Sequence, residues 1–433
     1  MTPRLRILAV DLFERPVPFT HPFRFGAVTV DGAHEACVRV TAEVDGRRAA
    51  GGSAELMVPK WFDKDLAKTP AQTVDNLRRS LSLAADAYRG GAGTAFGIHA
   101  DRHAAHAAAC GRRGIPPLAA AFGPAELDKA VLDALFRALG VGAWAGLAAN
   151  LPGLDARLAP DLDDGAISAF LASRIPAAAV PVRHAVGFLD DLAALPGVLA
   201  RTGCRFVKCK LSGDPGADAA RLDALAAVLP GAIQGVSVDA NEQYLPALLP
   251  DLAVLLRRSP LRDRLMYVEQ PLPRDALDLG GFGEDWICVL DEGDDAYGAF
   301  PDAMALGWRG VSSKSCKGTY KALLNALRAA RSGAMLTAED LTAQPGLALQ
   351  QDTALAAFLG VPHMERNGHC YTAGFTGDAE AARFAPSGLY DGRRVRLRDG
   401  TLPAAALGIA VGYGSDAHPD WDGLLPLREL QHG

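Results

Sequence analysis

The sequence predicts an α/β protein in which a small α+β unit precedes a parallel β/α barrel. Three observations support this prediction. The first 150 or so residues combine strand-like runs with alanine-rich helices. From about residue 178, eight short β-rich runs alternate with helical stretches at roughly the spacing of a βα unit. Polar residues stand at the carboxyl end of one run after another, as they do at the mouth of a barrel.

The size and composition of the chain fit this prediction. A length of 433 residues, with 49% hydrophobic and 22% charged residues, indicates one large or two ordinary domains and excludes a disordered chain. The net charge is only −6 and no block of like charge stands out, so we expect neither a nucleic-acid partner nor a membrane surface. Nine of the 44 basic residues are lysines, and five of these nine fall in two short clusters, namely Lys208, Lys210, Lys314, Lys317 and Lys321.

Cysteine usage and hydropathy predict a cytoplasmic location. Seven cysteines are scattered singly, without the paired spacing of a zinc or redox site, which suits a reducing compartment. The first ten residues lack the apolar core of a signal peptide, and no run of 18 apolar residues occurs.

The first unit should contain a small antiparallel sheet and helices. Residues 5–47 read as two extended runs joined by a loop that includes the Pro- and Phe-rich stretch 16–25. Alanine-rich, partly amphipathic patterns then predict helices at 73–88, 96–110 and 125–139.

The barrel prediction depends on the alternation that follows. Strands are expected at 180–186, 205–211, 233–238, 266–268, 287–290, 310–313, 334–337 and 362–365, and helices at 190–200, 218–229, 245–256, 320–331 and 347–359. The glycine-rich stretch 280–283 follows no predicted strand, so a dinucleotide-binding fold is not favoured.

The chemistry of the chain is concentrated at the ends of these strands. From Lys210 to Asp239, Glu269, Asp291 and Lys314 the steps are 29, 30, 22 and 23 residues, each about one βα unit. Because the carboxyl ends of parallel strands meet at one face of a barrel, these five side chains should converge there.

Three converging carboxylates repel one another unless a cation lies among them. Oxygen ligands with room for water favour Mg²⁺, with Mn²⁺ as a substitute. Such an ion would act as a Lewis acid on a substrate carboxylate. We expect a partly desolvated lysine beside it to have a pKa depressed toward neutrality and to act as a base, while the second lysine returns a proton from the other face.

The motifs Lys-Cys-Lys, Val-Asp-Ala-Asn, Val-Glu-Gln-Pro, Leu-Asp-Glu and Ser-Lys-Ser-Cys-Lys, in this order, resemble the enolase superfamily. Within it they are most similar to the muconate-lactonizing-enzyme-like subgroup of the mandelate racemase/muconate lactonizing enzyme family. The resemblance implies a modified TIM barrel, (β/α)7β, with an N-terminal α+β capping domain and a homo-oligomeric assembly. It implies a capping domain at 1–150 with two lid loops, a barrel at 151–385, and a segment at 386–433 that packs back on the cap.

The same resemblance assigns roles to individual residues. Asp239, Glu269 and Asp291 would hold the metal, with Glu292 as the alternative third ligand or as the partner of a lysine. Lys210 and Lys314 would be the opposed acid/base pair, and Lys208 would orient Lys210 or neutralise the substrate. Further residues near the site or the substrate would be Asn241, Lys317, His363, Glu365 and Asn367, together with Phe23, Arg24, Glu55 and Trp61 from the lid loops at 19–29 and 53–65.

Three residues carry a second interpretation. His363 is nearly as well explained as a polar core residue, and Glu339 and Asp340 at the seventh strand would cap the following helix rather than contact a substrate. The mandelate-racemase-like branch has a histidine at that strand end, which this chain lacks.

The expected function is the Mg²⁺-dependent abstraction of the α-proton of a small carboxylic acid through an ene-diolate. Two opposed lysines favour a racemase or epimerase, an isomerase. A dehydratase (lyase) of a hydroxy or sugar acid and a cycloisomerase would use the same intermediate. A Schiff-base aldolase and a non-enzymatic binding protein remain as other classes.

Overall fold

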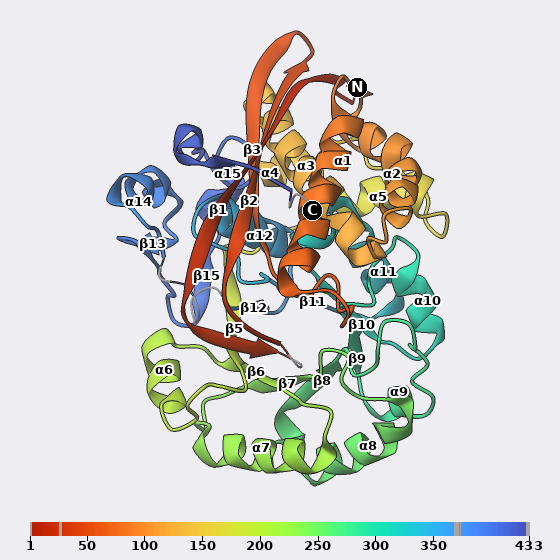
Figure 1. The fold of residues 1–433 in the computed structure, drawn as a ribbon, viewed down its shortest axis with the longest axis vertical. Helices are drawn as coiled ribbons and strands as arrows, with labels where there is room; N and C mark the ends of the chain where they lie inside the picture. The colour runs from red at the N-terminus through yellow and green to blue at the C-terminus, as the bar shows by residue number, and fades with distance from the viewer. Residues whose placement is uncertain (1, 26–27, 368–371, 373, 430–433) are drawn as a thin grey trace.

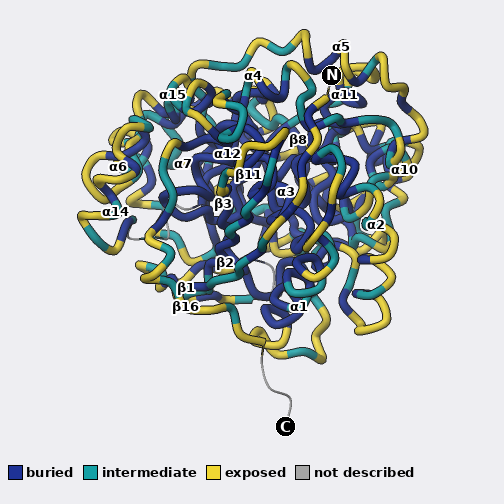
Figure 2. Tube along the Cα trace, turned by 90° about the horizontal axis from the view of Figure 1, so that it is seen from above, coloured by how far each residue is buried: buried dark blue, intermediate teal, exposed yellow. Residues whose placement is uncertain are grey.

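The computed structural model describes residues 2–25, 28–367, 372 and 374–429. An antiparallel sheet with helices, the cap, lies against a closed parallel barrel (Figure 1). Buried residues gather in the centre of the molecule, across both parts (Figure 2). Among the described residues, no helix has the length and apolar composition that crossing a membrane requires.

The cap sheet is built mainly from three long strands, β1 (Leu5–Phe25), β2 (Val28–Val44) and β3 (Arg47–Met57), paired antiparallel in this order. Two short strands, β4 (Ala92–Gly93) and β16 (Leu425–Pro426), pair with β1. The helices of this region are α1 (Pro70–Tyr88), α2 (Ala95–Gly111), α3 (Pro117–Leu139), α4 (Ala143–Ala148) and α5 (Asp164–Ala172). Helix α3 is buried over most of its length because it packs on the sheet and on α1.

Two stretches expected to be loops belong to strands. The Pro- and Phe-rich stretch 16–25 continues β1, which pairs with β2 through Pro16 and Pro18. Proline is tolerated there because, among the described residues, Pro16 and Pro18 pair with β2 alone, while the neighbouring Phe19 forms an isolated bridge with Thr372. Residues 53–57 likewise form the end of β3, with Glu55 opposite Ala36.

The barrel has eight parallel strands in sequential order, and β12 closes the circle on β5. All eight predicted strands are confirmed. Their bounds are β5 (Ala179–Val186), β6 (Phe206–Lys210), β7 (Gly235–Asp239), β8 (Leu265–Glu269), β9 (Cys288–Leu290), β10 (Gly310–Ser313), β11 (Met335–Glu339) and β12 (Met364–Arg366).

A helix follows each of the first seven strands, which gives the predicted (β/α)7β order. These helices are α6 (Leu195–Thr202), α7 (Pro215–Val228), α8 (Leu249–Arg258), α9 (Phe282–Asp285), α10 (Ala299–Ala305), α11 (Thr319–Ser332) and α12 (Leu347–Leu359). Short 3-10 turns lie at Ala156–Leu158, Pro246–Leu248, Arg262–Arg264, Ser315–Lys317, Ala385–Ser387 and Trp421–Gly423. The sequence pattern missed α9 and α10, which are too short to show a helical period.

The last part of the chain contacts both the barrel and the cap. It contains α14 (Asp378–Phe384), β13 (Tyr390–Asp391), β14 (Arg394–Val395), β15 (Thr401–Pro403) and α15 (Ala405–Ile409). Strand β15 pairs antiparallel with β5 of the barrel, whereas β16 pairs with β1 of the cap. The six described cysteines are buried and free, and Cys370 lies outside the described residues.

A buried charge cluster joins the cap to the barrel beside the turn Ser315–Lys317. Lys129 Nζ of α3 lies 3.1 Å from Glu55 Oε2, 2.9 Å from Glu126 Oε1 and 3.2 Å from Ser315 Oγ. Ser315 Oγ in turn donates to Asp352 of α12. Two carboxyl groups therefore share one ammonium group, and Asp352 is linked to it through Ser315. Burial raises the pKa of Glu126 to about 8 against the opposing effect of Lys129.

Close packing of β3 on α3 predicts the effect of one added methyl group. A Cβ at Gly51 would lie 2.1 Å from the Ala130 carbonyl oxygen and 2.2 Å from the Ala134 nitrogen, both backbone atoms that cannot rotate away. We expect Gly51→Ala to lower the free energy of unfolding by about 1–3 kcal/mol. Gly111→Ala, at a site with no heavy atom within 4 Å, is the matched control for thermal unfolding. Equal melting temperatures for the two variants would contradict the close packing.

The buried cluster predicts how stability depends on pH. Because the pKa of Glu126 rises from 4.5 to about 8 on folding, the folded protein binds the extra proton between these values and loses stability as the pH increases through them. We expect Glu126→Gln to reduce the drop in melting temperature between pH 5 and pH 8. Lys129→Met leaves the carboxyl groups without a cation, so it should enlarge that drop. Parallel pH profiles for Glu126→Gln and the wild type would contradict this account.

Candidate metal and lysine site

The register of the barrel strands brings the predicted residues together. Lys210 at the end of β6 is paired with Asp239 at the end of β7, and Asp239 is paired with Glu269 at the end of β8. Asp291 and Lys314 directly follow β9 and β10. The carboxyl ends of parallel strands share one face of a barrel, so these side chains meet at its mouth, where all are buried.

Lys208 is the centre of this cluster. Its Nζ lies 2.8 Å from Asp239 Oδ2, 3.2 Å from Glu269 Oε2 and 3.0 Å from Glu339 Oε2, and it also pairs with Glu365 of β12. One fully buried ammonium group therefore contacts four carboxyl groups from four different strands. Arg183, 3.8 Å from Glu365, adds a second buried cation on the β5 side.

Lys210 and Lys314 lie on opposite sides of the barrel. Their strands, β6 and β10, are four steps apart in a closed circle of eight. Lys210 Nζ donates to Asp239 Oδ2 at 2.6 Å, whereas Lys314 Nζ lies 2.9 Å from Asp291 Oδ2 and 2.8 Å from Glu339 Oε2. Two ammonium groups thus face the same space from opposite walls.

Without a metal ion among the carboxyl groups, the pKa values of both lysines are raised. Burial lowers the pKa of Lys210 and of Lys314, but Asp239 beside Lys210, and Asp291 and Glu339 beside Lys314, outweigh burial and raise both values. Among the carboxyl groups, burial raises the pKa of Glu269 to about 8, with Lys208 opposing and Asp239 adding to the rise. The carboxyl group of Asp239 is also buried, but Lys208 and Lys210 lower its pKa.

Glu339 corrects the sequence interpretation. It was expected to cap the following helix, but α12 begins only at Leu347 and the Glu339 side chain contacts Lys208 and Lys314. Its neighbour Asp340 accepts hydrogen bonds from the Thr342 and Asn367 nitrogens and so does stabilise the turn. The signal for Glu339 was present, because it lies 25 residues after Lys314 at the end of the next strand.

Three carboxyl groups have the geometry to hold a metal ion. One oxygen each of Glu269, Asp291 and Glu339 lies within 4.8 Å of the others, and all three residues are buried. Among the described residues, neither oxygen of Glu269 accepts a hydrogen bond, although Oε2 faces the Lys208 ammonium group. An oxygen-only donor set that includes such a buried carboxyl group fits a hard divalent ion such as Mg²⁺.

Asp239, a sequence-predicted ligand, is not one of these three but shares the Lys208 ammonium group with Glu269 and Glu339. Its Oδ2 faces Lys208 and Lys210, and its Oδ1 accepts a hydrogen bond from the Asn241 nitrogen at 2.8 Å. Of the neighbouring pair Asp291 and Glu292, the first belongs to the triad. Glu292 Oε1 instead lies 3.0 Å from Lys64 Nζ and accepts from Asn241 Nδ2.

Two residues hold Asp291 in place. Lys317 Nζ donates to the Asp291 carbonyl oxygen at 2.9 Å and lies 3.3 Å from its Oδ1. Gln270 Oε1 accepts hydrogen bonds from the Asp291 and Gly293 nitrogens. Sequence reasoning had assigned Lys317 to the surroundings of the site and had missed Gln270, whose glutamine side chain gave no signal of its own.

The segment between β3 and α1, residues 58–69, reaches from the cap to the barrel mouth and is called the lid here. Lys64 of the lid donates to the Asn241 carbonyl oxygen and lies 2.5 Å from Glu242 Oε2. Arg274 donates from the barrel side to the carbonyl oxygens of Trp61 and Phe62. Trp61, one of the predicted lid residues, places its ring 4.4 Å from Lys314 Nζ, whereas Lys64 was not predicted.

Other predicted residues lie outside the cluster of lysines and carboxyl groups. Glu55 pairs with Lys129 in the cap–barrel cluster. His363 bonds Arg183 inside the barrel, between Phe206 and Tyr267, and burial together with Arg183 lowers its pKa to about 3, which favours the polar core interpretation.

The contacts of three further predicted residues are with other parts of the molecule. Asn367 donates its backbone nitrogen to Asp340, and Phe23 packs on Phe25. Arg24 is exposed at the end of β1, with its guanidinium 5.9 Å from the Phe188 ring.

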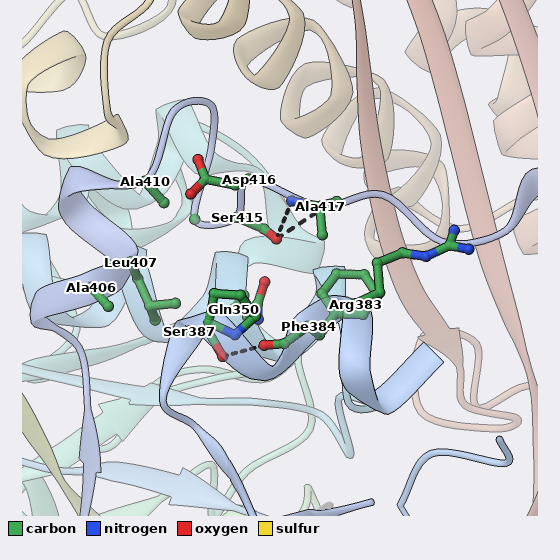
Figure 3. Close-up of a pocket in the computed structure, with 12 residues that line it drawn as sticks. Gln350, Arg383, Phe384, Ser387, Ala406, Leu407, Ala410, Ser415, Asp416 and Ala417 are labelled. Carbon is green, nitrogen blue, oxygen red and sulfur yellow. Dashed lines mark hydrogen bonds between the residues drawn. The ribbon is translucent and has the colours of Figure 1, made fainter. Parts of the chain in front are cut away.

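A small cavity is lined by none of these candidate site residues. It has a volume of about 50 Å³ and lies between α12, α14, α15 and the turn at 414–417 (Figure 3). Both side-chain polar atoms of Gln350, which lines it, have no hydrogen-bond partner. The cavity has the size and polarity for a few water molecules rather than for a substrate.

Comparison with known proteins identifies the fold. No protein-family model and no curated protein sequence matches this chain. Solved structures do match it over nearly its whole length. An enolase superfamily member from Roseovarius nubinhibens ISM is 20% identical, with a TM-score of 0.66, covering 98% of this chain and 99% of that chain.

Two further structures are similar at the same level. A muconate lactonizing enzyme from Pseudomonas fluorescens, complexed with muconolactone, is 18% identical with a TM-score of 0.63, covering 97% of this chain and 96% of that one. A dipeptide epimerase from Enterococcus faecalis V583, complexed with Mg and the dipeptide L-Leu-L-Tyr, is 17% identical with a TM-score of 0.63, covering 94% and 99%. The chain therefore has the capped-barrel fold of the enolase superfamily, as its strand-end motifs predict.

Proposed function

We propose that this protein is an enolase superfamily enzyme that abstracts the α-proton of a small carboxylic acid with the help of Mg²⁺, most simply as a racemase or epimerase. The observation that carries the proposal is the pair of buried lysines on opposite barrel strands, with carboxyl groups suited to a divalent ion between them. The structural neighbours support it, because their names include a dipeptide epimerase with Mg and a muconate lactonizing enzyme.

The proposed chemistry follows from what each group can do. Glu269, Asp291 and Glu339 would hold the ion, with Asp239 as the further sequence-predicted ligand. When bound, Mg²⁺ would supply Lewis acidity to the substrate carboxylate. Lys210 and Lys314 would each accept or donate the α-proton at its own face, and Lys208 would neutralise negative charge between them. Carboxyl groups that bind a cation raise the pKa of a neighbouring lysine less than carboxyl groups without one. The bound ion therefore favours the neutral amine that a base requires.

Opposed lysines favour a 1,1-proton transfer over elimination. Inversion at the α-carbon needs a base on one face and an acid on the other, and arginine could not serve because it does not deprotonate. Dehydration and cycloisomerisation share the first step, so the identity of the product distinguishes them.

The direct test is exchange of the α-hydrogen in D2O with Mg²⁺, followed by NMR on both enantiomers of mandelate, N-acetylated amino acids and dipeptides. We expect Lys210→Ala and Lys314→Ala each to slow exchange from one enantiomer, a different one for each variant, by about 100-fold or more. Lys210→Arg and Lys314→Arg keep the positive charge and should not restore exchange. Absence of exchange from every acid, with the wild type and the lysine variants alike, would overturn the proposal.

Metal binding tests the ligand set independently of turnover. Titration with Mn²⁺, followed by electron paramagnetic resonance, should show at least about tenfold weaker binding for Glu269→Gln, Asp291→Asn and Glu339→Gln. Asp239→Asn measures whether the fourth carboxylate also contributes. Glu43→Gln, in a partly exposed pair with Arg48, is the matched control. Unchanged affinity in Glu339→Gln would remove Glu339 from the ligand set.

A further inference from the structure

The two candidate acid/base lysines are held by different parts of the molecule. Lys210 Nζ has its ion pair with Asp239, so its support comes from the barrel alone. Lys314 Nζ contacts Asp291 and Glu339 of the barrel and also lies 4.4 Å from the centroid of the Trp61 ring of the lid. Among the described lysines of the barrel mouth, only Lys314 has a cation–π contact.

The position of the Trp61 ring is well determined by its neighbours. The ring packs edge-on against Phe62, with centroids 4.8 Å apart, and Phe62 packs against Phe122 of α3 at 5.2 Å. Trp61 is buried, with 3% of its surface exposed. The indole therefore has an aromatic support on the cap side and the Lys314 ammonium group on the barrel side.

The lid is fixed to the barrel at Trp61 and again shortly after it. Arg274 Nη2 donates to the Trp61 carbonyl oxygen at 3.3 Å, and Arg274 is itself paired with Glu242. Three residues after Trp61, Lys64 pairs with Glu242 and Glu292. These contacts explain how a residue of the cap can present its ring to a barrel side chain at a defined distance.

We propose that Trp61 is a positioning residue for Lys314 alone, so that the lid completes one of the two proton-transfer faces while the barrel itself forms the other. This inference rests on the proposed function. At the Lys314 face the substrate Cα–H bond breaks, the proton joins the neutral Lys314 amine, and the electron pair stays on the substrate as an ene-diolate. At the other face the Lys210 ammonium group supplies a proton to that carbon.

This asymmetry gives the two enantiomers different sensitivities to the lid. The enantiomer whose α-hydrogen faces Lys314 depends on the Trp61 ring, because the ring limits where the amine can lie. The enantiomer that faces Lys210 does not, since Lys210 contacts Asp239 and not the lid. A lid that acted only by excluding water would affect both enantiomers equally.

The test compares α-hydrogen exchange from both enantiomers of the panel acids used above, in D2O with Mg²⁺. Lys314→Ala first identifies which enantiomer belongs to the Lys314 face. We expect Trp61→Leu to slow exchange from that enantiomer by about tenfold and from the other by less than about twofold. Trp61→Phe, which keeps an aromatic face, should restore most of the loss.

Two controls separate positioning from general effects. Leu66→Ala, in the same lid at a residue that is 90% exposed, should leave both exchange rates unchanged. Mn²⁺ affinity should be the same in Trp61→Leu and the wild type, which shows that the barrel mouth is intact.

The outcomes distinguish the two proposals. Equal slowing of both enantiomers by Trp61→Leu, or no slowing of either, would overturn the role of Trp61 while leaving the proton-transfer function in place. Failure of the wild type to exchange either enantiomer of any acid would overturn the proposed function and this inference with it.

Discussion

The arrangement of the barrel mouth depends on one buried cation, Lys208. Carboxyl groups from four strands contact its ammonium group, and each of them would be costly to bury in charged form without a partner. Lys208 and Lys210 alternate with Cys209 on one short strand, so both point to the same side, while Cys209 packs outward. The geometry of the site thus follows from placing two lysines at positions i and i+2 on β6.

The carboxyl groups at the barrel mouth differ in their neighbours and therefore in their pKa values. Asp239 is held ionised between two lysines, whereas Glu269, with neither oxygen hydrogen-bonded, has a raised pKa and favours a proton or a cation. Environments that separate pKa values in this way are typical of sites that bind ions or transfer protons. The lid adds a third kind of partner, an aromatic face, at Lys314 only.

Much of this arrangement could be predicted from the sequence, because the spacing between polar residues at successive strand ends can be read without knowing how the side chains pack. It placed all eight barrel strands, and it brought Lys208, Lys210, Asp291 and Lys314 to one face. The spacing did not assign Glu339 to the site, since a Glu-Asp pair at the end of a strand is equally typical of a helix cap.

What the sequence could not predict depends on contacts between distant segments. The pairing of Lys64 with Glu292 joins residues 228 positions apart, and no local pattern encodes it. The strand character of 16–25 was hidden by its prolines, which are tolerated because, among the described residues, Pro16 and Pro18 pair with β2 alone. The raised pKa of the lysines in the absence of a metal ion has a similar origin, because the number of carboxyl groups around each one is a property of the closed barrel.

The final segment of the chain also constrains how this molecule can open. Because β15 is paired with the barrel and β16 with the cap, the two parts are tied at both ends of the chain rather than joined by a single linker. A swing of the whole cap about one hinge would break the β16 pairing and expose the buried cluster around Lys129. Displacement of the 58–69 segment alone would instead uncover the barrel mouth while leaving both strand pairings intact.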